Sequence, residues 1–360
     1  MVAQGPPLMR IAQVAPLFES VPPTAYGGTE RVVAYLTDAL VDLGHEVTLV
    51  ASGDSHTRAR LMPAAPRSLR LDQSCRDYLA YHIRELEMVA RHADSFDVIH
   101  FHTGFLHMPL ARRLPTPSVT TLHGRLDLPE VQVLMESLPD VPVVSISDAQ
   151  RLPLPMANWI GTVYHGLPQH LLPFRAVADD YVAFIGRISP EKRVDRAIAI
   201  AGHAGVELRI AAKVDAADRD YFAQTIEPLL HSPGVQYLGE IGEQEKAALL
   251  GGARALLFPI DWPEPFGMVV IEALSCGTPV IAWGHGSVPE LLDDGVTGWI
   301  VDSIDAAVGA IGRTGDIDRA ACRAAFDQRF GAGRMAEDYL AIYNRLIQRP
   351  QRGCLEAMSA

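Results

Sequence analysis

Residues Asp261 to Val280 read Asp-Trp-Pro-Glu-Pro-Phe-Gly-Met-Val-Val-Ile-Glu-Ala-Leu-Ser-Cys-Gly-Thr-Pro-Val, and they determine how the rest of the chain is interpreted. An apolar run at 255–260 precedes them and predicts a short buried strand. Two prolines then exclude regular structure, residues 268–274 predict a helix, and the Gly-Thr-Pro that follows is typical of a helix C-terminus. Glu264 is therefore expected in a rigid loop ahead of a helix N-terminus, and Glu272 on that helix.

This arrangement suits a ligand that carries both phosphate and hydroxyl groups. The first amides of the helix point back toward the loop and favour an anionic oxygen there. Two carboxylates at the same place can accept hydrogen bonds from hydroxyl groups. The alternative is that Glu264 caps the helix and Glu272 is solvated, as expected of an isolated pair of glutamates. The Pro-Phe-Gly-Met and Gly-Thr-Pro-Val sequences around them favour a binding site.

The length and composition predict two globular domains. A chain of 360 residues with 48% hydrophobic side chains can form two sizeable cores. No apolar run reaches the roughly 18 residues needed to span a bilayer, and Met1 to Pro7 lacks the features of a signal peptide. We therefore expect a cytoplasmic location.

Cysteine usage and net charge argue against two further classes. The cysteines at positions 75, 276, 322 and 354 show no CxxC spacing, so they are expected to be reduced thiols rather than a disulfide framework or a zinc site. The formal net charge of -12 argues against a nucleic-acid-binding protein.

Alternating strand and helix patterns occur in two series. The first begins with the apolar run 9–16, which is typical of a parallel strand covered on both faces, and the second begins with residues 181–188. Residues 164–168 break the pattern between them. The predicted fold class is therefore α/β, with two facing doubly wound domains, residues 1–168 and 169–334, and a cleft between them.

A Gly-Gly pair after the first strand predicts a place for an anion. Gly27-Gly28-Thr29-Glu30 precedes apolar residues at helical spacing, so a strand, a turn and a helix N-terminus are expected in that order. Glycines let the backbone approach a ligand, and free N–H groups face it. The pattern is not the G-x-G-x-x-G fingerprint of dinucleotide binding, which argues against an NAD enzyme.

Two cations are predicted at the ligand-binding edge of the second domain. Arg187 ends a strand and Lys192 opens the next helix, where both can neutralise a diphosphate. The alternative is a surface salt-bridge cluster with Glu191 and Asp195.

Several histidines and one acidic pair raise the question of a metal. His123 ends a strand and precedes a glycine, which places it at the rim where open parallel sheets bind ligands. His100, His102 and His107 match no metal motif, so we interpret them as hydrogen-bonded residues. Asp218-Arg219-Asp220 has the DxD form of a metal motif but lies in a charged helical stretch, and we interpret it as solvated surface.

A basic stretch in the first domain contains Arg58, Arg60, Arg67 and Arg70 and is interrupted by prolines. A solvated, irregular connection is the favoured interpretation. The alternative is a surface that binds the acceptor or an anionic membrane, which would make the protein membrane-peripheral.

The stretch from Asp261 to Val280 resembles the Glu-x7-Glu motif of family 4 of the retaining glycosyltransferases, which have the GT-B fold. Residues 184–193, Phe-Ile-Gly-Arg-Ile-Ser-Pro-Glu-Lys-Arg, are similar to the family's diphosphate-binding segment, and residues 27–30 to its donor-phosphate loop. The chain departs from the family at His165-Gly166, where Asn-Gly is common. The resemblance implies two facing Rossmann-like domains, with a C-terminal segment at about 335–360 that crosses back onto the first.

The resemblance also implies roles for individual residues. Glu264 would hold the hydroxyls of the transferred sugar, Glu272 those of the ribose, and His123 would contact the sugar near the reacting carbon. The loop at Ile241 would read the nucleobase. The implied catalytic residues are His123, Arg187, Lys192 and Glu264, and the implied donor-binding residues are Gly27, Gly28, Arg187, Lys192, Ile241, Glu264, Phe266, Gly267, Met268, Val269 and Glu272.

The implied activity is transfer of a hexose from a nucleoside diphosphate sugar to an acceptor, with retention at the anomeric carbon. UDP-glucose is the favoured donor and GDP-mannose the next, and the sequence does not identify the acceptor. No metal or other cofactor is expected, because Arg187 and Lys192 already supply positive charge. The alternatives are a nucleotide-sugar hydrolase or epimerase on the same fold, and a non-enzymatic two-lobe sugar-binding protein.

Overall fold

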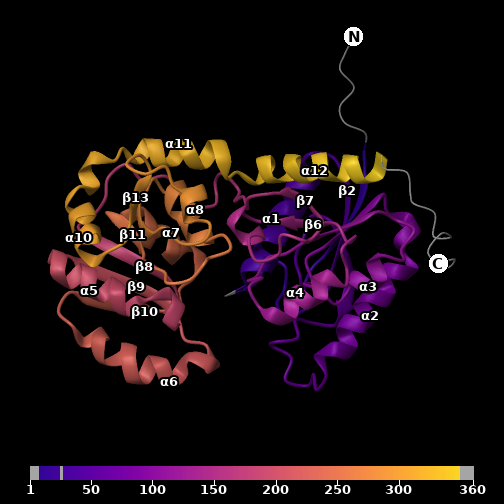
Figure 1. The fold of residues 1–360 in the computed structure, drawn as a ribbon, viewed down its shortest axis with the longest axis horizontal. Helices are drawn as coiled ribbons and strands as arrows, with labels where there is room; N and C mark the ends of the chain where they lie inside the picture. Colours follow the sequence, from indigo (N-terminus) through magenta and orange to yellow (C-terminus); the bar gives the residue numbers. More distant parts are fainter. Residues whose placement is uncertain (1–7, 25–26, 349–360) are drawn as a thin grey trace, which may run out of the picture. The chain divides into compact units, whose positions relative to one another are not determined.

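The computed structural model describes residues 8–24 and 27–348, which form two compact units (Figure 1). The predicted boundaries, after residues 168 and 334, lie a few residues beyond the observed ones. Unit 1 consists of the residues up to 146, residues 151–166 and the segment from 332, and unit 2 consists of residues 147–150 and 167–331.

The segment 147–150 belongs to unit 2, whereas the sequence placed it in the first domain. Ser147 Oγ donates to the carbonyl of Pro265 at 2.6 Å. The amides of Asp148 and Ala149 donate to the carboxylate of Glu290 at 2.8 and 2.7 Å. These partners lie more than a hundred residues away along the chain, so local sequence patterns do not indicate them.

Unit 1 is built on a seven-stranded sheet in which the strand order is β3-β2-β1-β4-β5-β6-β7 and every neighbouring pair is parallel. Helices α1 and α12 pack together on one face, and α2 packs on the other face. Burial on both faces explains the continuous apolar runs of the central strands. The strands are β1 Arg10–Val14, β2 Glu46–Ser52, β3 Arg60–Ala65, β4 Val98–Phe101, β5 Ser118–Thr121, β6 Val143–Ser145 and β7 Trp159–Thr162. The helices are α1 Gly28–Asp42, α2 Tyr78–Arg91, α3 Met108–Ala111, α4 Pro129–Glu136 and α12 Ala332–Gln348.

The basic stretch is not an irregular connection, because it contains the edge strand β3. Pro63 lies within this strand, and a sheet edge tolerates proline because one side of the strand needs no N–H donor. Arg58 forms an ion pair with Asp42 at 2.6 Å, and Arg70 forms one with Glu19 at 2.9 Å. At least these two arginines are therefore partly neutralised by their own unit.

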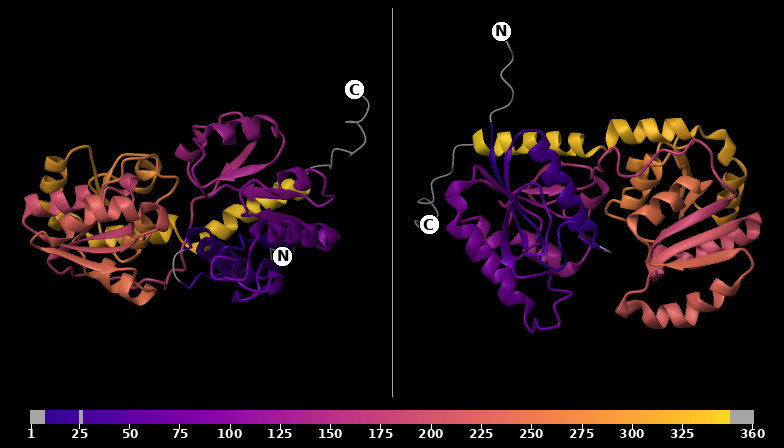
Figure 2. Two further views of the ribbon diagram at one scale, coloured as in Figure 1. Left: turned by 90° about the horizontal axis from the view of Figure 1, so that it is seen from below. Right: turned by 180° about the vertical axis from the view of Figure 1, so that it is seen from behind.

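Helix α12 returns to unit 1, as the resemblance implied, and it packs against α1 and β4 (Figures 1 and 2). Its buried face includes Met335, Tyr339 and Tyr343. Tyr343 Oη accepts a hydrogen bond from Gln13 Nε2 at 3.0 Å, which links the helix to the middle of the sheet. The predicted segment extends to residue 360, and its part beyond 348 lies outside the described residues.

Unit 2 is built on a six-stranded parallel sheet with the order β10-β9-β8-β11-β12-β13. Helices α5 and α10 pack together against it, and α7 and α8 form a second pair. The strands are β8 Tyr181–Arg187, β9 Glu207–Lys213, β10 Val235–Gly239, β11 Ala255–Phe258, β12 Val280–Trp283 and β13 Gly298–Val301. The helices are α5 Val194–Ala204, α6 Arg219–Tyr221, α7 Glu243–Gly252, α8 Met268–Ser275, α9 Val288–Leu291, α10 Ile304–Gly312 and α11 Arg319–Arg329.

The segment from Arg219 to His231 does not form a regular α-helix. It consists of the short α6, a π-helical turn at Phe222–Ile226 and a 3-10 turn at Glu227–His231. Pro228 lies in this segment and has no N–H to donate to the preceding turn, which accounts for the interruption.

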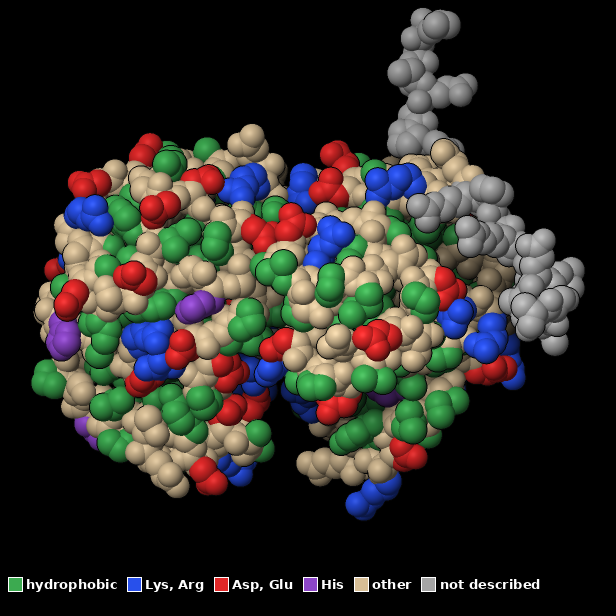
Figure 3. Space-filling view, viewed as in Figure 1, with side chains coloured by type: hydrophobic (Ala, Val, Ile, Leu, Met, Phe, Trp, Pro, Cys, Tyr) green, Lys and Arg blue, Asp and Glu red, His purple; other side chains and the backbone are tan. Residues whose placement is uncertain are grey.

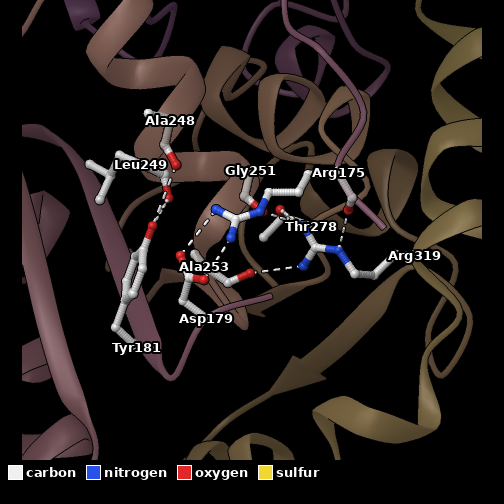
Figure 4. Close-up of polar contacts among 9 residues, drawn as sticks. All are labelled: Arg175, Asp179, Tyr181, Ala248, Leu249, Gly251, Ala253, Thr278 and Arg319. Carbon is white, nitrogen blue, oxygen red and sulfur yellow. Dashed lines mark hydrogen bonds and ion pairs between the residues drawn. The ribbon is translucent and has the colours of Figure 1, made fainter. Parts of the chain in front are cut away.

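The chain that leads into β8 is held by two arginines (Figure 4). Arg175 forms an ion pair with Asp179 at 2.6 Å. Arg319 donates to the backbone carbonyls of Arg175 at 2.7 Å, Ala253 at 2.8 Å and Gly251 at 2.7 Å. The guanidinium of Arg319 thus provides hydrogen-bond donors for backbone carbonyls both at the end of α7 and in the segment before β8, which links this segment to α7.

No described helix is long and apolar enough to cross a bilayer. Cys75, Cys276 and Cys322 are free thiols, and Cys354 lies outside the described residues. On the face of the molecule drawn in Figure 3, acidic and basic side chains are interspersed.

Candidate functional site

The loop before α8 has the rigidity that its prolines predicted. Gly267 precedes the helix with a φ of 82°, a conformation that side chains other than glycine rarely adopt. Ser287 Oγ donates to the carbonyl of Phe266 at 2.6 Å, and the amide of Ser287 donates to the carbonyl of Glu264 at 3.0 Å. Gly286 lies so close to the backbone of Glu264 that a side chain there would overlap it. The loop between β11 and α8 is therefore fixed from both sides.

Glu264 and Lys192 meet at this loop. The Lys192 ammonium group donates to the Glu264 carboxylate, and the two side chains are 15% and 12% exposed. Trp262 Nε1 donates to the same carboxylate oxygen at 2.9 Å. The Lys192 ammonium also lies 5.2 Å from the centre of the Trp262 ring and 5.7 Å from that of Phe258. A cation, a carboxylate and the first amides of α8 thus lie together, and Lys192 pairs with Glu264 rather than with the Asp195 named in the alternative interpretation.

Glu272 is buried on α8 and forms an ion pair with Lys246 of α7, so the alternative of a solvated Glu272 is wrong. Lys246 was not predicted to belong to the site. The available signal was its rarity, because the chain has only three lysines, Lys192, Lys213 and Lys246. Two of these three pair with the two glutamates of the motif, and Lys213 lies 3.2 Å from Asp215.

Arg187 ends β8 among acidic side chains. Its guanidinium lies 3.0 Å from Glu191, 3.6 Å from Asp215 and 3.9 Å from Asp218. Asp218 therefore faces Arg187, and the interpretation of the DxD sequence as solvated surface is wrong for this residue. Burial raises the pKa of Asp218, and the charge of Arg187 opposes that rise. No described group of three or more His, Cys, Asp or Glu side chains has a geometry that could hold a metal ion.

The predicted residues of the nucleobase loop lie beside the sheet of unit 2. Gly239 ends β10 with a φ of 70°, which turns the chain toward α7. Ile241 packs against a buried cluster that includes Tyr181, Ala183 and Leu249. The side chain of Ile241 is thus used in packing, and its backbone is what remains for a ligand.

In unit 1, α1 begins at Gly28 as the Gly-Gly turn predicted. An added methyl group at Gly27 would overlap Pro23, whereas the space beside Gly28 is open within 4 Å. Glu30 lies buried in the first turn, and burial raises the pKa of its carboxyl group, with a further contribution from Glu19. Glycine is therefore required at position 27, and position 28 leaves room for a ligand.

His123 lies just beyond β5, half-buried, in a cluster of histidines. Its Nε2 lies 2.8 Å from His102 Nδ1, and its ring stacks on that of His165 with centres 5.2 Å apart. His123 Nδ1 is shielded from solvent and has no hydrogen-bond partner among the described residues. Burial lowers the pKa of His123 to about 3, so the ring is neutral at pH 7.

The other histidines are hydrogen-bonded, as interpreted from the sequence. His100 Nε2 lies 2.7 Å from Thr121 Oγ1, and His102 Nε2 lies 2.8 Å from Gln13 Oε1. His107 Nε2 lies 2.6 Å from Thr120 Oγ1. Sequence reasoning missed that His102 and Gln13 connect to His123.

The fold and these clusters define a class, the two-domain α/β glycosyltransferases with the GT-B fold, which confirms the predicted fold class. The chain resembles AviGT4, a glycosyltransferase involved in avilamycin A biosynthesis, at 26% identity with a TM-score of 0.73, over 95% of this chain and 99% of that one. It shares its fold with sucrose-phosphate synthase from Thermosynechococcus elongatus, at 19% identity with a TM-score of 0.78, over 94% and 99% of the two chains. HepE from Anabaena, crystallised with UDP-glucose, matches at 18% identity with a TM-score of 0.70, over 94% and 100%.

The chain belongs to Glycosyltransferase Family 4, whose profile matches residues 26–216, and the profile described as Glycosyl transferases group 1 matches residues 175–312. The family and the enzyme class predicted from the sequence are thereby confirmed. D-inositol 3-phosphate glycosyltransferase of Mycolicibacterium paratuberculosis is 33% identical over 181 residues, 47% of this chain and 41% of that protein. The corresponding protein of Mycobacterium tuberculosis is 32% identical over 199 residues, 49% and 40% of the two. The match thus spans about two fifths of the length of these relatives.

Proposed function

We propose that this protein is a retaining glycosyltransferase that transfers a hexose from a nucleoside diphosphate sugar, with UDP-glucose as the favoured donor and GDP-mannose as the next. The observation that carries the proposal is the meeting of Glu264 and Lys192 in front of α8. A carboxylate accepts hydrogen bonds from sugar hydroxyls, and an ammonium group and free helix amides bind phosphate oxygens. Glu264, Lys192 and the first amides of α8 together offer the groups that the sugar and the diphosphate of such a donor require.

The reaction as proposed depends on stabilising the diphosphate that leaves. Negative charge grows on its oxygens as the bond to the sugar breaks, so fixed cations and amides aimed at it lower the barrier. Lys192, Arg187, the first amides of α8 after Gly267 and the amide of Gly28 are assigned this task. The acidic neighbours of Arg187 hold its guanidinium in place. Pairing with Glu264 likewise holds the Lys192 ammonium, which keeps donors to spare for a phosphate.

The proposal assigns the remaining parts of the donor to the other predicted residues. Glu264 accepts from the hydroxyls of the sugar and Glu272 from those of the ribose, and the backbone at Ile241 contacts the nucleobase. Phe266, Met268 and Val269 supply the backbone that surrounds the phosphates. His123 of unit 1 contacts the sugar, and its low pKa suits a neutral hydrogen-bonding group rather than a base.

Metal independence is part of the proposal, because cationic side chains supply the positive charge that a metal would otherwise provide. A phosphorylated cyclitol is the first acceptor to test, since the partly matching relatives are D-inositol 3-phosphate glycosyltransferases. The stretch from Arg58 to Arg70 is proposed to bind the acceptor or, alternatively, to contact an anionic membrane.

Two measurements test the proposed function. A panel of nucleotide sugars is screened by thermal shift, since a ligand that binds the folded protein raises its melting temperature. Release of the nucleoside diphosphate is then followed with and without acceptors. Release that requires an acceptor supports the transferase, whereas equal release without one indicates a hydrolase. A donor that stabilises the protein but is never consumed with any acceptor indicates a binding protein.

A further inference from the structure

A continuous line of hydrogen bonds joins His123 to helix α12 through the core of unit 1. His123 Nε2 contacts His102 Nδ1 at 2.8 Å, and His102 Nε2 contacts Gln13 Oε1 at 2.8 Å. Gln13 Nε2 donates to Tyr343 Oη at 3.0 Å, and Tyr343 Oη contacts His100 Nδ1 at 2.7 Å. His102, Gln13, Tyr343 and His100 are all buried.

Each histidine in this line carries one ring proton at neutral pH. Burial lowers the pKa of His123 to about 3 and those of His100 and His102 well below their usual value. A neutral imidazole has one N–H donor and one bare nitrogen, and the partner of either nitrogen decides which of them holds the proton.

The side-chain amide of Gln13 decides which atom donates in each hydrogen bond between Gln13 and His123. Its Nε2 faces Tyr343, so its Oε1 faces His102 and can only accept. His102 must therefore be protonated at Nε2, which leaves its Nδ1 bare. Because His102 Nδ1 carries no proton, it accepts in the hydrogen bond that it shares with His123, and His123 Nε2 is the donor. His123 Nδ1 is then a lone pair.

We infer that Gln13 and His102 are positioning residues that hold His123 as the Nε2-protonated tautomer, so that His123 accepts a hydrogen bond from a hydroxyl of the transferred sugar through Nδ1. The inference rests on the proposed function, which brings a sugar to His123. It explains why Nδ1 lacks a hydrogen-bond partner among the described residues although it is shielded from water. An acceptor that has already lost its water gains a full hydrogen bond when a hydroxyl reaches it.

This tautomer selects for a particular ligand group. A bare nitrogen accepts from an O–H group and repels a carbonyl or a phosphate oxygen. His165 stacks on the ring of His123, with the two planes 18° apart. His123 would thus distinguish a sugar with a free hydroxyl at this position from one in which that hydroxyl is absent or methylated.

The tautomer itself is read by nitrogen-15 NMR of the free protein, which separates a protonated from a bare ring nitrogen. The signals of His123 are assigned by their loss in His123→Gln. We expect a bare Nδ1 and a protonated Nε2 on His123. A protonated Nδ1 would overturn the inference whatever the enzyme transfers.

The role of Gln13 is tested by Gln13→Met, which keeps the length of the side chain and removes its directing amide. We expect a mixture of His123 tautomers, a rate of transfer lower by about 2- to 10-fold, and unchanged affinity for UDP. Gln132→Met, the same change at an exposed position of α4, serves as the control and should alter none of these.

The outcomes separate this inference from the proposed function. If Gln13→Met redistributes the tautomers, melts like the wild type and transfers sugar at the wild-type rate, the positioning role is rejected while the transferase assignment stands. If the wild type transfers no sugar from any donor, the proposed function fails, and with it the sugar contact of His123.

Discussion

The buried ion pair of Lys246 and Glu272 allows the structural and ligand-binding roles of the motif to be separated. The two side chains are 14% and 7% exposed. Lys246→Met keeps the aliphatic part of the side chain and removes the charge, so the Glu272 carboxylate is left buried without its cation. Breaking a fully buried pair in this way costs about 3–5 kcal/mol, and the residual exposure of Lys246 lowers our expectation to about 2–4 kcal/mol of unfolding free energy.

The second substitution, Glu272→Gln, removes the carboxylate charge as well. Because no unpaired charge remains, we expect the double variant to regain most of the lost stability. The affinity of the double variant for UDP should be low, because Glu272→Gln removes the carboxylate that the proposed hydrogen bonds from the ribose hydroxyls need. Those bonds contribute about 1.5–3 kcal/mol, which corresponds to a roughly 10- to 150-fold weaker affinity.

Urea unfolding measures the stability of each variant, and calorimetry measures its affinity for UDP. Arg91→Met is the control, because Arg91 and Glu87 form an exposed pair on α2 whose loss should change stability by less than about 0.5 kcal/mol. If the double variant bound UDP as tightly as the wild type, the ribose contact would be refuted and Glu272 would be only the structural partner of Lys246.

Four further outcomes are expected. Glu264→Ala should reduce the rate of transfer while leaving UDP affinity nearly unchanged, and Lys192→Ala should weaken UDP binding by about 1.5–3 kcal/mol in calorimetry; equal losses of UDP affinity in both variants would contradict this division. Activity should persist in excess EDTA, and a loss restored by Mg2+ or Mn2+ would exclude metal independence. If the stretch Arg58 to Arg70 contacts a membrane, liposomes with anionic lipid should retain the protein at low salt and release it at high salt, and equal binding to neutral liposomes would reject this contact. Burial raises the pKa of Glu85 to about 7, so the unfolding free energy should fall as the pH rises from about 4.5 through 7 and this buried carboxyl group loses its proton. Glu85→Gln should remove this pH dependence of the stability measured by urea unfolding, and an unchanged pH dependence would show that another group causes it.

The parts of the fold that local chemistry determines could be predicted. The helix predicted at 268–274 is α8, Met268–Ser275, because Gly267 begins it and the Gly-Thr-Pro after it ends it. The continuous apolar runs predicted parallel strands covered on both faces, and both sheets are parallel throughout their described strands. These signals act over a few residues, so one sequence is enough to show them.

The partners of the site residues could not be predicted, because they depend on distant contacts. Lys192 and Glu264 are 72 positions apart, and Lys246 and Glu272 are 26 apart. The edge strand β3 was missed for a related reason, since Pro63 argues against a strand unless that strand lies at an edge, and only the completed sheet shows where the edge is.

The line of hydrogen bonds from His123 to Tyr343 contains one part that the sequence predicts and one part that it does not. His100 and His102 are two residues apart near the end of β4, so they were bound to share a face, and Gln13 pairs in register with His100 on the neighbouring strand. The sequence did not indicate which helix covers that face, and in the structure this helix is α12, from the far end of the chain. Apolar side chains at these positions would fill the same space without the cost of burying the four polar side chains of Gln13, His100, His102 and Tyr343. A fully connected polar line stabilises little more than an apolar core, but it gives every proton in it a definite place. The directed line ends at His123 Nδ1, and an unpartnered lone pair there serves no folding purpose that the described contacts reveal. The physical reason for keeping such a line in a core is therefore to be sought in what His123 binds.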